Sequence, residues 1–326
     1  MITEAIKNFS EQLKFEPEIK NAEKLIAAKT YIVAGMGGSN LATDLVKIGR
    51  PMLDIISHRD YGLPAMPDEK MKNSLIIAVS YSGNTEETID AFKTALDRNL
   101  PVACIGVNGK LLELAEENKI PCVKIPDTGI QPRSAVGFMM IGLLKLMGLE
   151  DAIEEIKKTA ERLDLTKTEN DGKILAEKLN GKIPVVYSSS KNGAIAYNWK
   201  IRFNETGKTP AFYNVFPELN HNEMVSFDVQ APTEQLTNKF HFIFLKDEND
   251  HPRIQLRMEI LENLYRDKGL EVENYEIKGI NSWEKIFSSL LIADWASYYT
   301  ATAYGLNPEE VEMVEEFKKL LKEKNF

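Results

Sequence analysis

Three short hydroxyl side chains, Ser80, Ser82 and Thr85, follow the apolar run LIIAV at residues 75–79 and precede an acidic helix start. Hydroxyls between a strand and a helix N-terminus can hold an anion, together with the free backbone N–H groups and the positive end of the helix dipole. Because the loop lacks the lysine and the spacing of a P-loop, it favours a phosphomonoester over a nucleoside triphosphate. The alternative is a plain capping turn, in which Thr85 only stabilises the helix start.

A second glycine-rich turn, GMGGSN at 35–40, follows the strand-like run YIVAG. It begins like a dinucleotide fingerprint, but it lacks the third glycine and an acidic residue at the end of the next strand. Loops at neighbouring strand ends of a doubly wound sheet face one crevice. We therefore expect Ser39 to join the hydroxyl loop around one ligand.

Acid–base chemistry has two candidates, Glu205 in RFNETGKTP and His221 in FPELNHNEM. Either residue alone would more often be a solvated surface group. Beside a phosphate site, they predict an acid–base pair that acts on a sugar. Arg133, which follows Pro132 at the start of an apolar helix, is either a clamp on backbone carbonyls or a fixed cation for developing charge.

Metal and redox chemistry find little support in the sequence. The four histidines, at positions 58, 221, 241 and 251, show no HxH or HxxxH spacing. Cys104 and Cys122 lie in apolar stretches, which predicts two buried, reduced thiols. We expect no metal and no cofactor.

The composition is that of an ordinary globular protein, with 326 residues, 43% of them hydrophobic and 27% charged. A formal charge of -9 and the absence of a Lys/Arg run argue against a nucleic-acid partner. No apolar run approaches the ~20 residues of a membrane span, and the N-terminus does not resemble a signal peptide. We therefore expect no membrane partner and a cytoplasmic location.

Short apolar runs alternate with longer helical patterns, which predicts an α/β fold with parallel, doubly wound sheets. The runs in the first half lie at 31–35, 75–79, 102–106 and 122–125. A buried helix follows them, and then a polar stretch, so we divide the chain into domains at 1–150 and 151–326.

The second half repeats this plan. PVVYSSSKNGAIAYNW at 184–199 parallels the region of the glycine turn, and the segment 240–272 parallels that of the hydroxyl loop. Where the first copy has hydroxyls, the second has Asp247, Glu248 and Asp250, whose carboxylates would repel a phosphate. We predict one phosphate site per chain, and two C-terminal helices separated by Gly305 and Pro308.

In this order and at these intervals, the motifs GMGGS, SYSGNTEET, QPRSAVG, FNETGK and FPELNHNE resemble the bifunctional phosphoglucose/phosphomannose isomerase family. The resemblance extends from about residue 30 to the C-terminus. It implies two doubly wound sugar isomerase (SIS) domains, with C-terminal helices that pack back on the active site. It also implies metal-free interconversion of glucose 6-phosphate and fructose 6-phosphate through a cis-enediolate, with mannose 6-phosphate as a second candidate substrate.

The resemblance further assigns roles to residues. Glu205 would move a proton between C1 and C2, and Arg133 would stabilise the enediolate. His221, reaching across the interface of a homodimer, would help to open the sugar ring, and Lys318 on the C-terminal helix would approach the ring oxygen. The residues implied to bind the substrate phosphate are Gly38, Ser39, Ser80, Ser82 and Thr85.

One departure from the family concerns substrate choice. Dual-specificity members have a threonine seven residues before the lysine, and this chain has Val311 there. The departure leaves the glucose 6-phosphate activity as expected and the mannose 6-phosphate activity open.

Three rival functions remain. A non-catalytic sugar-phosphate sensor would need neither Glu205 nor His221. An amidotransferase-type aminosugar synthase would require an N-terminal nucleophilic cysteine, and the sequence begins Met-Ile-Thr. A nucleotide-dependent dehydrogenase has the weakest support.

Overall fold

A computed structural model describes residues 2–324 and divides them into two units. The first unit comprises Thr3–Asp164 and Lys278–Ser288, and the second comprises Leu165–Ile277 and the described residues from Ser289 onward. A division of the sequence at one point does not anticipate the return of residues 278–288 to the first unit. This return means that helix α13 (Ser282–Ala303) contributes residues to both units.

The first unit contains a six-stranded sheet in the order β1-β6-β5-β4-β2-β3. Neighbouring strands are parallel, except that the short β1 pairs antiparallel with β6. The four apolar runs of the first half form β2, β4, β5 and β6, as predicted, because strands covered on both faces need continuous apolar residues. The strands are β1 (Ile19–Lys20), β2 (Thr30–Ala34), β3 (Asp54–His58), β4 (Ser74–Val79), β5 (Val102–Gly106) and β6 (Cys122–Lys124).

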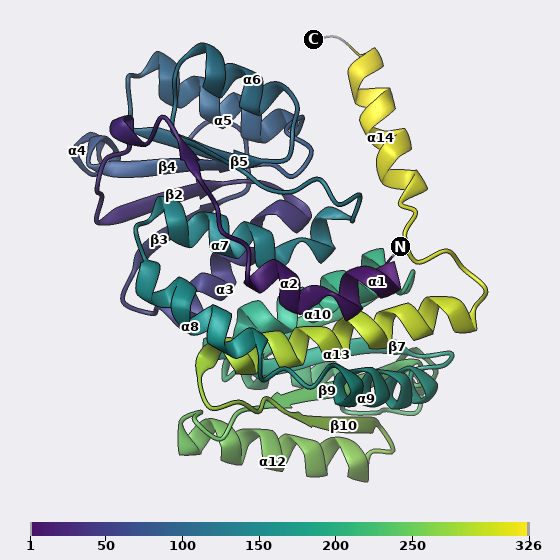
Figure 1. The fold of residues 1–326 in the computed structure, drawn as a ribbon. Helices are drawn as coiled ribbons and strands as arrows, with labels where there is room; N and C mark the ends of the chain where they lie inside the picture. Colours follow the sequence, from purple (N-terminus) through teal and green to yellow (C-terminus); the bar gives the residue numbers. More distant parts are fainter. Residues whose placement is uncertain (1, 325–326) are drawn as a thin grey trace. The chain divides into compact units, whose positions relative to one another are not determined.

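Helices cover both faces of this sheet. On one face, α5 and α6 pack on a cluster of buried residues that includes Ile76 and Phe92, and α3 and α7 lie on the other face (Figure 1). Helix α7 is buried almost throughout, which confirms the buried helix predicted there. The helices of this part are α1 (Ile2–Lys7), α2 (Phe9–Leu13), α3 (Leu41–Gly49), α4 (Asp68–Lys72), α5 (Glu86–Asp97), α6 (Lys110–Glu117), α7 (Val136–Leu146) and α8 (Glu150–Ala160).

The two cysteines are free and buried, as predicted. They occupy paired positions on the parallel strands β5 and β6. A hydrogen bond to Cys122, together with burial, keeps the pKa of the Cys104 thiol well above its usual value, which favours the protonated form.

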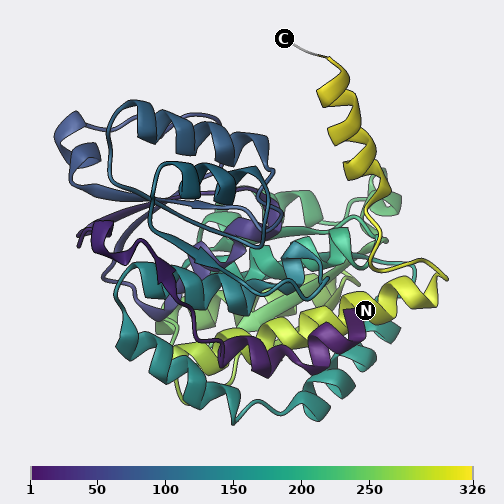
Figure 2. The same cartoon turned by 45° about the horizontal axis from the view of Figure 1, so that its top comes forward.

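The second unit contains a four-stranded, wholly parallel sheet in the order β10-β9-β7-β8. An aromatic cluster that includes Tyr187, Phe242 and Tyr265 fills the space between this sheet and helix α12. Figure 2 shows the same elements from a second direction. The elements are α9 (Leu165–Lys178), β7 (Ile183–Ser189), α10 (Gly193–Glu205), β8 (Phe212–Phe216), α11 (Glu234–Thr237), β9 (Phe240–Lys246), α12 (Pro252–Asp267), β10 (Glu271–Glu276) and α14 (Glu312–Glu323).

The two units share one connection plan, which agrees with the internal repeat predicted from the sequence. In the first, β2 leads through the 3-10 turn η2 (Gly37–Asn40) into α3, and β2 pairs with β4. In the second, β7 leads through η4 (Ser190–Asn192) into α10, and β7 pairs with β9. In each sheet the next strand is added on one side of the first parallel strand, and the strand after it is added on the other side: β3 and β4 flank β2, and β8 and β9 flank β7. The loops that follow the central pair of strands therefore flank the topological switch point, where open α/β sheets bind ligands.

The predicted C-terminal helices are α13 and α14, and they differ in burial. Helix α14 is amphipathic, yet its apolar side chains are exposed in the described single chain; that of Phe317 is 60% exposed. The expected packing of this helix on the active site therefore stays a prediction. The exposed apolar residues are Met313, Val314, Phe317, Leu320 and Leu321.

His241 is buried at the start of β9, beside a carboxylate. Its Nδ1 lies 2.9 Å from the Glu271 carboxylate, and its Nε2 has no hydrogen-bond partner among the described residues. Burial lowers the pKa of His241, while Glu271 and Glu273 act in the opposite direction and Lys182 adds to the lowering.

We expect the wild type to lose stability relative to His241→Gln as the pH falls below about 6.5, the value for histidine in the unfolded chain. The unfolded state then binds the extra proton, so the loss reaches at most about 1.4 kcal/mol per pH unit. Urea unfolding between pH 5 and 8 measures the difference. The exposed His251, changed to glutamine in the same way, serves as the control, and an equal pH dependence of both variants would contradict the prediction.

Candidate functional site

The two loops predicted to share a ligand lie together at the switch point of the first sheet. The backbone N–H of Tyr81, in the loop after β4, donates to Ser39 Oγ in η2 at 3.0 Å. Ser39 is buried, so its hydroxyl serves as a fixed link between the two strand ends. The glycine turn and the hydroxyl loop therefore meet at the strand ends, and their sharing of one ligand stays a prediction.

The hydroxyl loop is organised around Ser80. The Ser80 and Thr85 hydroxyls lie 2.9 Å apart, and the Thr85 N–H donates to Ser80 Oγ at 3.4 Å. Thr85 occupies the N-cap position of α5, but its side chain makes no capping hydrogen bond. The plain capping interpretation therefore does not describe this loop, whose hydroxyls bond to each other at a helix N-terminus.

Gly83 and Asn84 give the loop its shape. Gly83 has φ of +70°, and a Cβ built there would lie 1.7 Å from the carbonyl oxygen of Asn108. Asn84 donates to the Ser82 carbonyl oxygen at 3.1 Å and accepts from the Lys110 N–H at 3.1 Å. Ser82 is exposed beside this turn, and its Oγ accepts from the Asn84 N–H at 3.3 Å. The loop thus presents a hydroxyl to solvent on a backbone that only glycine permits at position 83.

Arg133 lies against the glycine turn. A Cβ at Gly38 would come within 2.6 Å of the Arg133 backbone nitrogen, so glycine allows η3 (Pro132–Ser134) to approach η2 closely. Arg133 is 2% exposed. The backbone of Arg133 therefore lies against the glycine turn, which in turn meets the hydroxyl loop.

In the second unit, Glu205 is the last residue of α10. It is half-buried. The helix that carries it is held by the buried Arg202, whose Nε donates to Asp294 at 2.6 Å. Trp199 adds a hydrogen bond to Ser289 Oγ at 2.9 Å. The position of Glu205 is therefore fixed by a rigid element.

Lys208, which no sequence motif predicts as part of the site, lies at the end of α10. Its Nζ donates to the carbonyl oxygen of Glu205 at 2.6 Å and to that of Glu310. A lysine near the last carbonyls of a helix is also favoured by the helix dipole. Lys208 therefore ties the end of α10 to the residue just before Val311, which is itself the N-cap of α14.

His221 and Lys318 are both accessible. His221 ends the 3-10 turn η5 (Glu218–His221) and is exposed. Lys318, on α14, donates to Glu315 at 2.7 Å. Both side chains are therefore available to a ligand or to a second molecule.

The switch point of the second sheet holds carboxylates in place of hydroxyls. Ser189 Oγ donates to the buried Asp250 carboxylate at 2.7 Å. Asn192 Nδ2 and Lys191 Nζ donate to Asp247, which is also buried, at 3.1 and 3.2 Å. The chain's own carboxylates thus use the donors that an anion would need. This arrangement supports the prediction that the second loop does not bind phosphate.

Sequence comparison extends the likeness from single motifs to nearly the whole chain. Residues 168–321 match the bacterial phospho-glucose isomerase C-terminal SIS domain family. The bifunctional phosphoglucose/phosphomannose isomerase of Aquifex aeolicus is 34% identical over 98% of this chain and 98% of its own length. The chain belongs to the bifunctional phosphoglucose/phosphomannose isomerase family.

Other relatives agree with this placement. The family member from Caldicellulosiruptor bescii is also 34% identical, over 98% of each chain. Among solved structures, glucosamine-6-phosphate deaminase from Thermotoga maritima superposes with a TM-score of 0.69 over 95% of this chain and 96% of its own. At 14% identity this likeness shows the fold alone. The predicted pair of SIS domains is therefore confirmed for this phosphoglucose/phosphomannose isomerase family member.

The described residues contain no cluster of metal ligands. Within residues 2–324, no three His, Cys, Asp or Glu side chains lie close enough to hold a metal ion. His58 bonds the Gly62 carbonyl at 3.1 Å, and His251 accepts from the Arg253 N–H at the start of α12. The helices in the described range are all too short or too polar to cross a membrane.

Because Ser82 is predicted to donate a hydrogen bond to the bound anion, we expect Ser82→Ala to weaken the binding of inorganic phosphate about tenfold. Isothermal titration calorimetry measures the dissociation constant. Ser190→Ala is the control, since Ser190 lies in η4, at the switch point of the second sheet, and its hydroxyl donates to the Phe216 carbonyl at 2.8 Å. An unchanged affinity of the Ser82 variant would refute the phosphate-loop assignment.

Proposed function

We propose that this chain is a metal-free aldose-ketose isomerase that interconverts glucose 6-phosphate and fructose 6-phosphate. The main support is the 34% identity, over 98% of both chains, with a relative named as a bifunctional phosphoglucose/phosphomannose isomerase. The hydroxyl loop at the switch point, which suits a phosphomonoester, agrees with it. The second substrate of this proposal is mannose 6-phosphate.

In this proposal the first unit binds the phosphate. Ser80, Ser82 and Thr85 donate hydrogen bonds at the N-terminus of α5, and Ser39 and the backbone at Gly38 complete the loop pair. The phosphate is remote from C1 and C2, so its binding energy serves to orient the reacting carbons.

Glu205 then acts as the base that removes the proton from one of C1 and C2 and returns it to the other. The intermediate is a cis-enediolate, whose negative charge Arg133 stabilises. His221 and Lys318 act before this step, when the pyranose ring opens: the ring oxygen must gain a proton and the C1 hydroxyl must lose one. No electron leaves the substrate, so the reaction requires no redox cofactor.

The proposal includes a homodimer in which His221 serves the partner's active site, and a cytoplasmic location. The exposure of His221 and of the apolar face of α14 in the single chain supports the homodimer. The two free thiols agree with a cytoplasmic location. A sugar-phosphate sensor is the rival, and it is not favoured, because the relatives are named as isomerases.

The test is a coupled assay of the purified, EDTA-treated protein with fructose 6-phosphate. Glucose 6-phosphate is detected directly and mannose 6-phosphate through a second coupling enzyme. Formation of both products is the expected result for the full proposal. Formation of glucose 6-phosphate alone would limit the proposed activity to glucose 6-phosphate and fructose 6-phosphate. The absence of both products would overturn it in favour of the sensor.

We expect Val311→Thr to raise mannose 6-phosphate formation several-fold relative to glucose 6-phosphate formation. Lys208 donates to the backbone carbonyls of both Glu205 and Glu310. Residue 311, which follows Glu310, is therefore held near the proposed base. Threonine has nearly the shape of valine and adds a hydroxyl that can bond the sugar as it turns about C2–C3. Val314→Thr, the same change one turn along α14, is the control. An unchanged product ratio would argue against Val311 as the specificity residue.

A further inference from the structure

The carboxylate of Glu223 joins the loop that carries His221 to two neighbouring strands. The Tyr187 hydroxyl, from β7, donates to Glu223 Oε1 at 2.5 Å. The Asn214 amide, from β8, donates to the other carboxylate oxygen. Since β7 and β8 are paired in the second sheet, a single side chain fixes the loop on a rigid surface.

Both donors are themselves fixed. Asn214 Oδ1 accepts from the Val215 N–H at 2.8 Å, which leaves the NH₂ group to donate to Glu223. Tyr187 is fully buried and packs between Phe242 and Phe244, with ring centroids 5.5 and 5.6 Å away. Burial raises the pKa of Tyr187 far above its usual value, so its hydroxyl keeps the proton that it donates. Two fixed donors match a carboxylate, which only accepts.

The backbone around Glu223 is held as well. The Glu223 N–H donates to Asn222 Oδ1 at 2.6 Å, and the Glu223 carbonyl accepts from Ser226 Oγ at 2.7 Å. On the other side of His221, Leu219 is buried in the aromatic cluster of the second sheet. His221 therefore stands exposed between two anchored residues.

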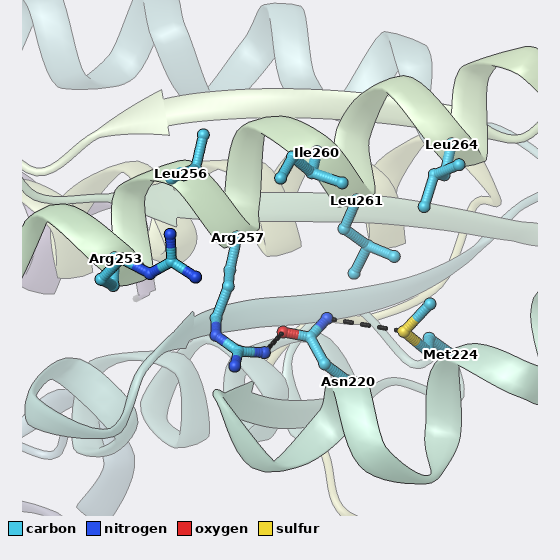
Figure 3. Close-up of a pocket in the computed structure, with 8 residues that line it drawn as sticks. All are labelled: Asn220, Met224, Arg253, Leu256, Arg257, Ile260, Leu261 and Leu264. Carbon is cyan, nitrogen blue, oxygen red and sulfur yellow. Dashed lines mark hydrogen bonds between the residues drawn. The ribbon is translucent and has the colours of Figure 1, made fainter.

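Asn220 supplies a third attachment, next to His221. Its Oδ1 accepts from Arg257 of α12 at 3.2 Å, and its amide nitrogen lies 3.7 Å from Met224 Sδ. Figure 3 shows Asn220 between these two side chains, in the groove along α12. The exposed side of this helix carries Leu256, Ile260 and Leu264. The loop of His221 is thus attached to a helix as well as to two strands.

We propose that Glu223 is a positioning residue, which sets the place and direction of the His221 imidazole through Tyr187 and Asn214. This inference rests on the proposed role of His221 in ring opening. Proton transfer requires the donor and acceptor to lie within hydrogen-bond reach, and a misplacement of about 1 Å can cost on the order of 100-fold in rate. A loop ordered before the substrate binds avoids that loss.

The first test is spectroscopic and needs no activity. The chain has four histidines, so protein labelled with ¹³C at histidine Cε1 gives few signals, and His221→Gln identifies that of His221. Tyr187→Phe should shift and broaden the His221 signal and leave that of His58 in place. Tyr299→Phe is the matched control, because it removes a 2.8 Å hydrogen bond to Glu169 elsewhere in the second unit. A His221 signal that is the same in Tyr187→Phe and wild type would overturn the proposal.

The second test is kinetic. Glu223→Ala should lower kcat about 10- to 100-fold with little change in KM, and it should have no further effect in a His221→Ala background. Effects that multiply in the double variant would show that Glu223 acts by another route, which would also overturn the proposal. If His221→Ala retains full activity while Tyr187→Phe still moves the His221 signal, the ring-opening role fails and the positioning stands. Should Glu223→Ala not fold, Tyr187→Phe carries the kinetic test as well.

Discussion

Glu205→Gln should reduce kcat by roughly 100- to 10,000-fold, the range that a positioned general base contributes. Glutamine has the shape of glutamate but cannot take a proton from carbon. The change leaves Arg202, which holds α10 through Asp294, and the hydroxyl loop of the first unit untouched. Affinity for inorganic phosphate should therefore stay within about twofold of the wild type.

The sharpest measurement follows hydrogen exchange at the substrate carbon. An isomerase that works through a base incorporates deuterium at C2 when it turns over in D₂O, and NMR detects this together with the change of sugar. Glu205→Gln should lose exchange and isomerisation together. Glu234→Gln, an exposed glutamate in the first turn of α11, is the control. More than a few per cent of residual turnover in the Glu205 variant would exclude Glu205 as the base.

Gly83→Ala should lower the affinity for inorganic phosphate by on the order of 100-fold. Alanine at φ of +70° would place Cβ 1.7 Å from the Asn108 carbonyl oxygen, so the loop or the segment at 108 must move. The loop that moves contains Ser80, Ser82 and Thr85, the proposed phosphate ligands. Calorimetric titration with phosphate measures the weaker binding, and urea unfolding measures the lower stability.

Gly148→Ala is the control that separates the destabilisation caused by a left-handed backbone from that caused by a steric clash. Gly148 also has φ of +70°, but a Cβ there would meet nothing within 4 Å. We expect this control to lose about 1–2 kcal/mol of stability from the left-handed backbone and to keep its phosphate affinity. Equal affinity losses in the two variants, or none in either, would show that the geometry at Gly83 does not govern binding.

The central strands could be predicted from the sequence, and the edge strands could not. Strands β4 and β5 are covered on both faces, so they appear as continuous apolar runs. At the edges, β10 has the sequence EVENYE, whose polar residues resemble those of a loop because part of the strand stays exposed. The antiparallel β1 has two residues, too few to form a pattern.

A similar limit applies to the candidate site. The hydroxyl loop and the glycine turn were predictable because each is a local motif at a strand end, and parallel strands bring their carboxyl ends to one edge. Tyr187 was not, because in PVVY it has the pattern of a core residue, and its contact with Glu223 joins positions 36 residues apart. Lys208, likewise, meets Glu310 across 102 residues. Such contacts depend on the fold, which a motif does not contain.

The carboxylates at the second switch point act as a built-in competitor. Asp250 is attached to the same chain as Ser189, so its effective concentration at that hydroxyl is far above that of any free anion in solution. A dissolved phosphate would have to displace it and would also meet the negative charge of Asp247. Titration of the chain with phosphate should therefore saturate in a single step, even though the chain contains two units with the same connection plan.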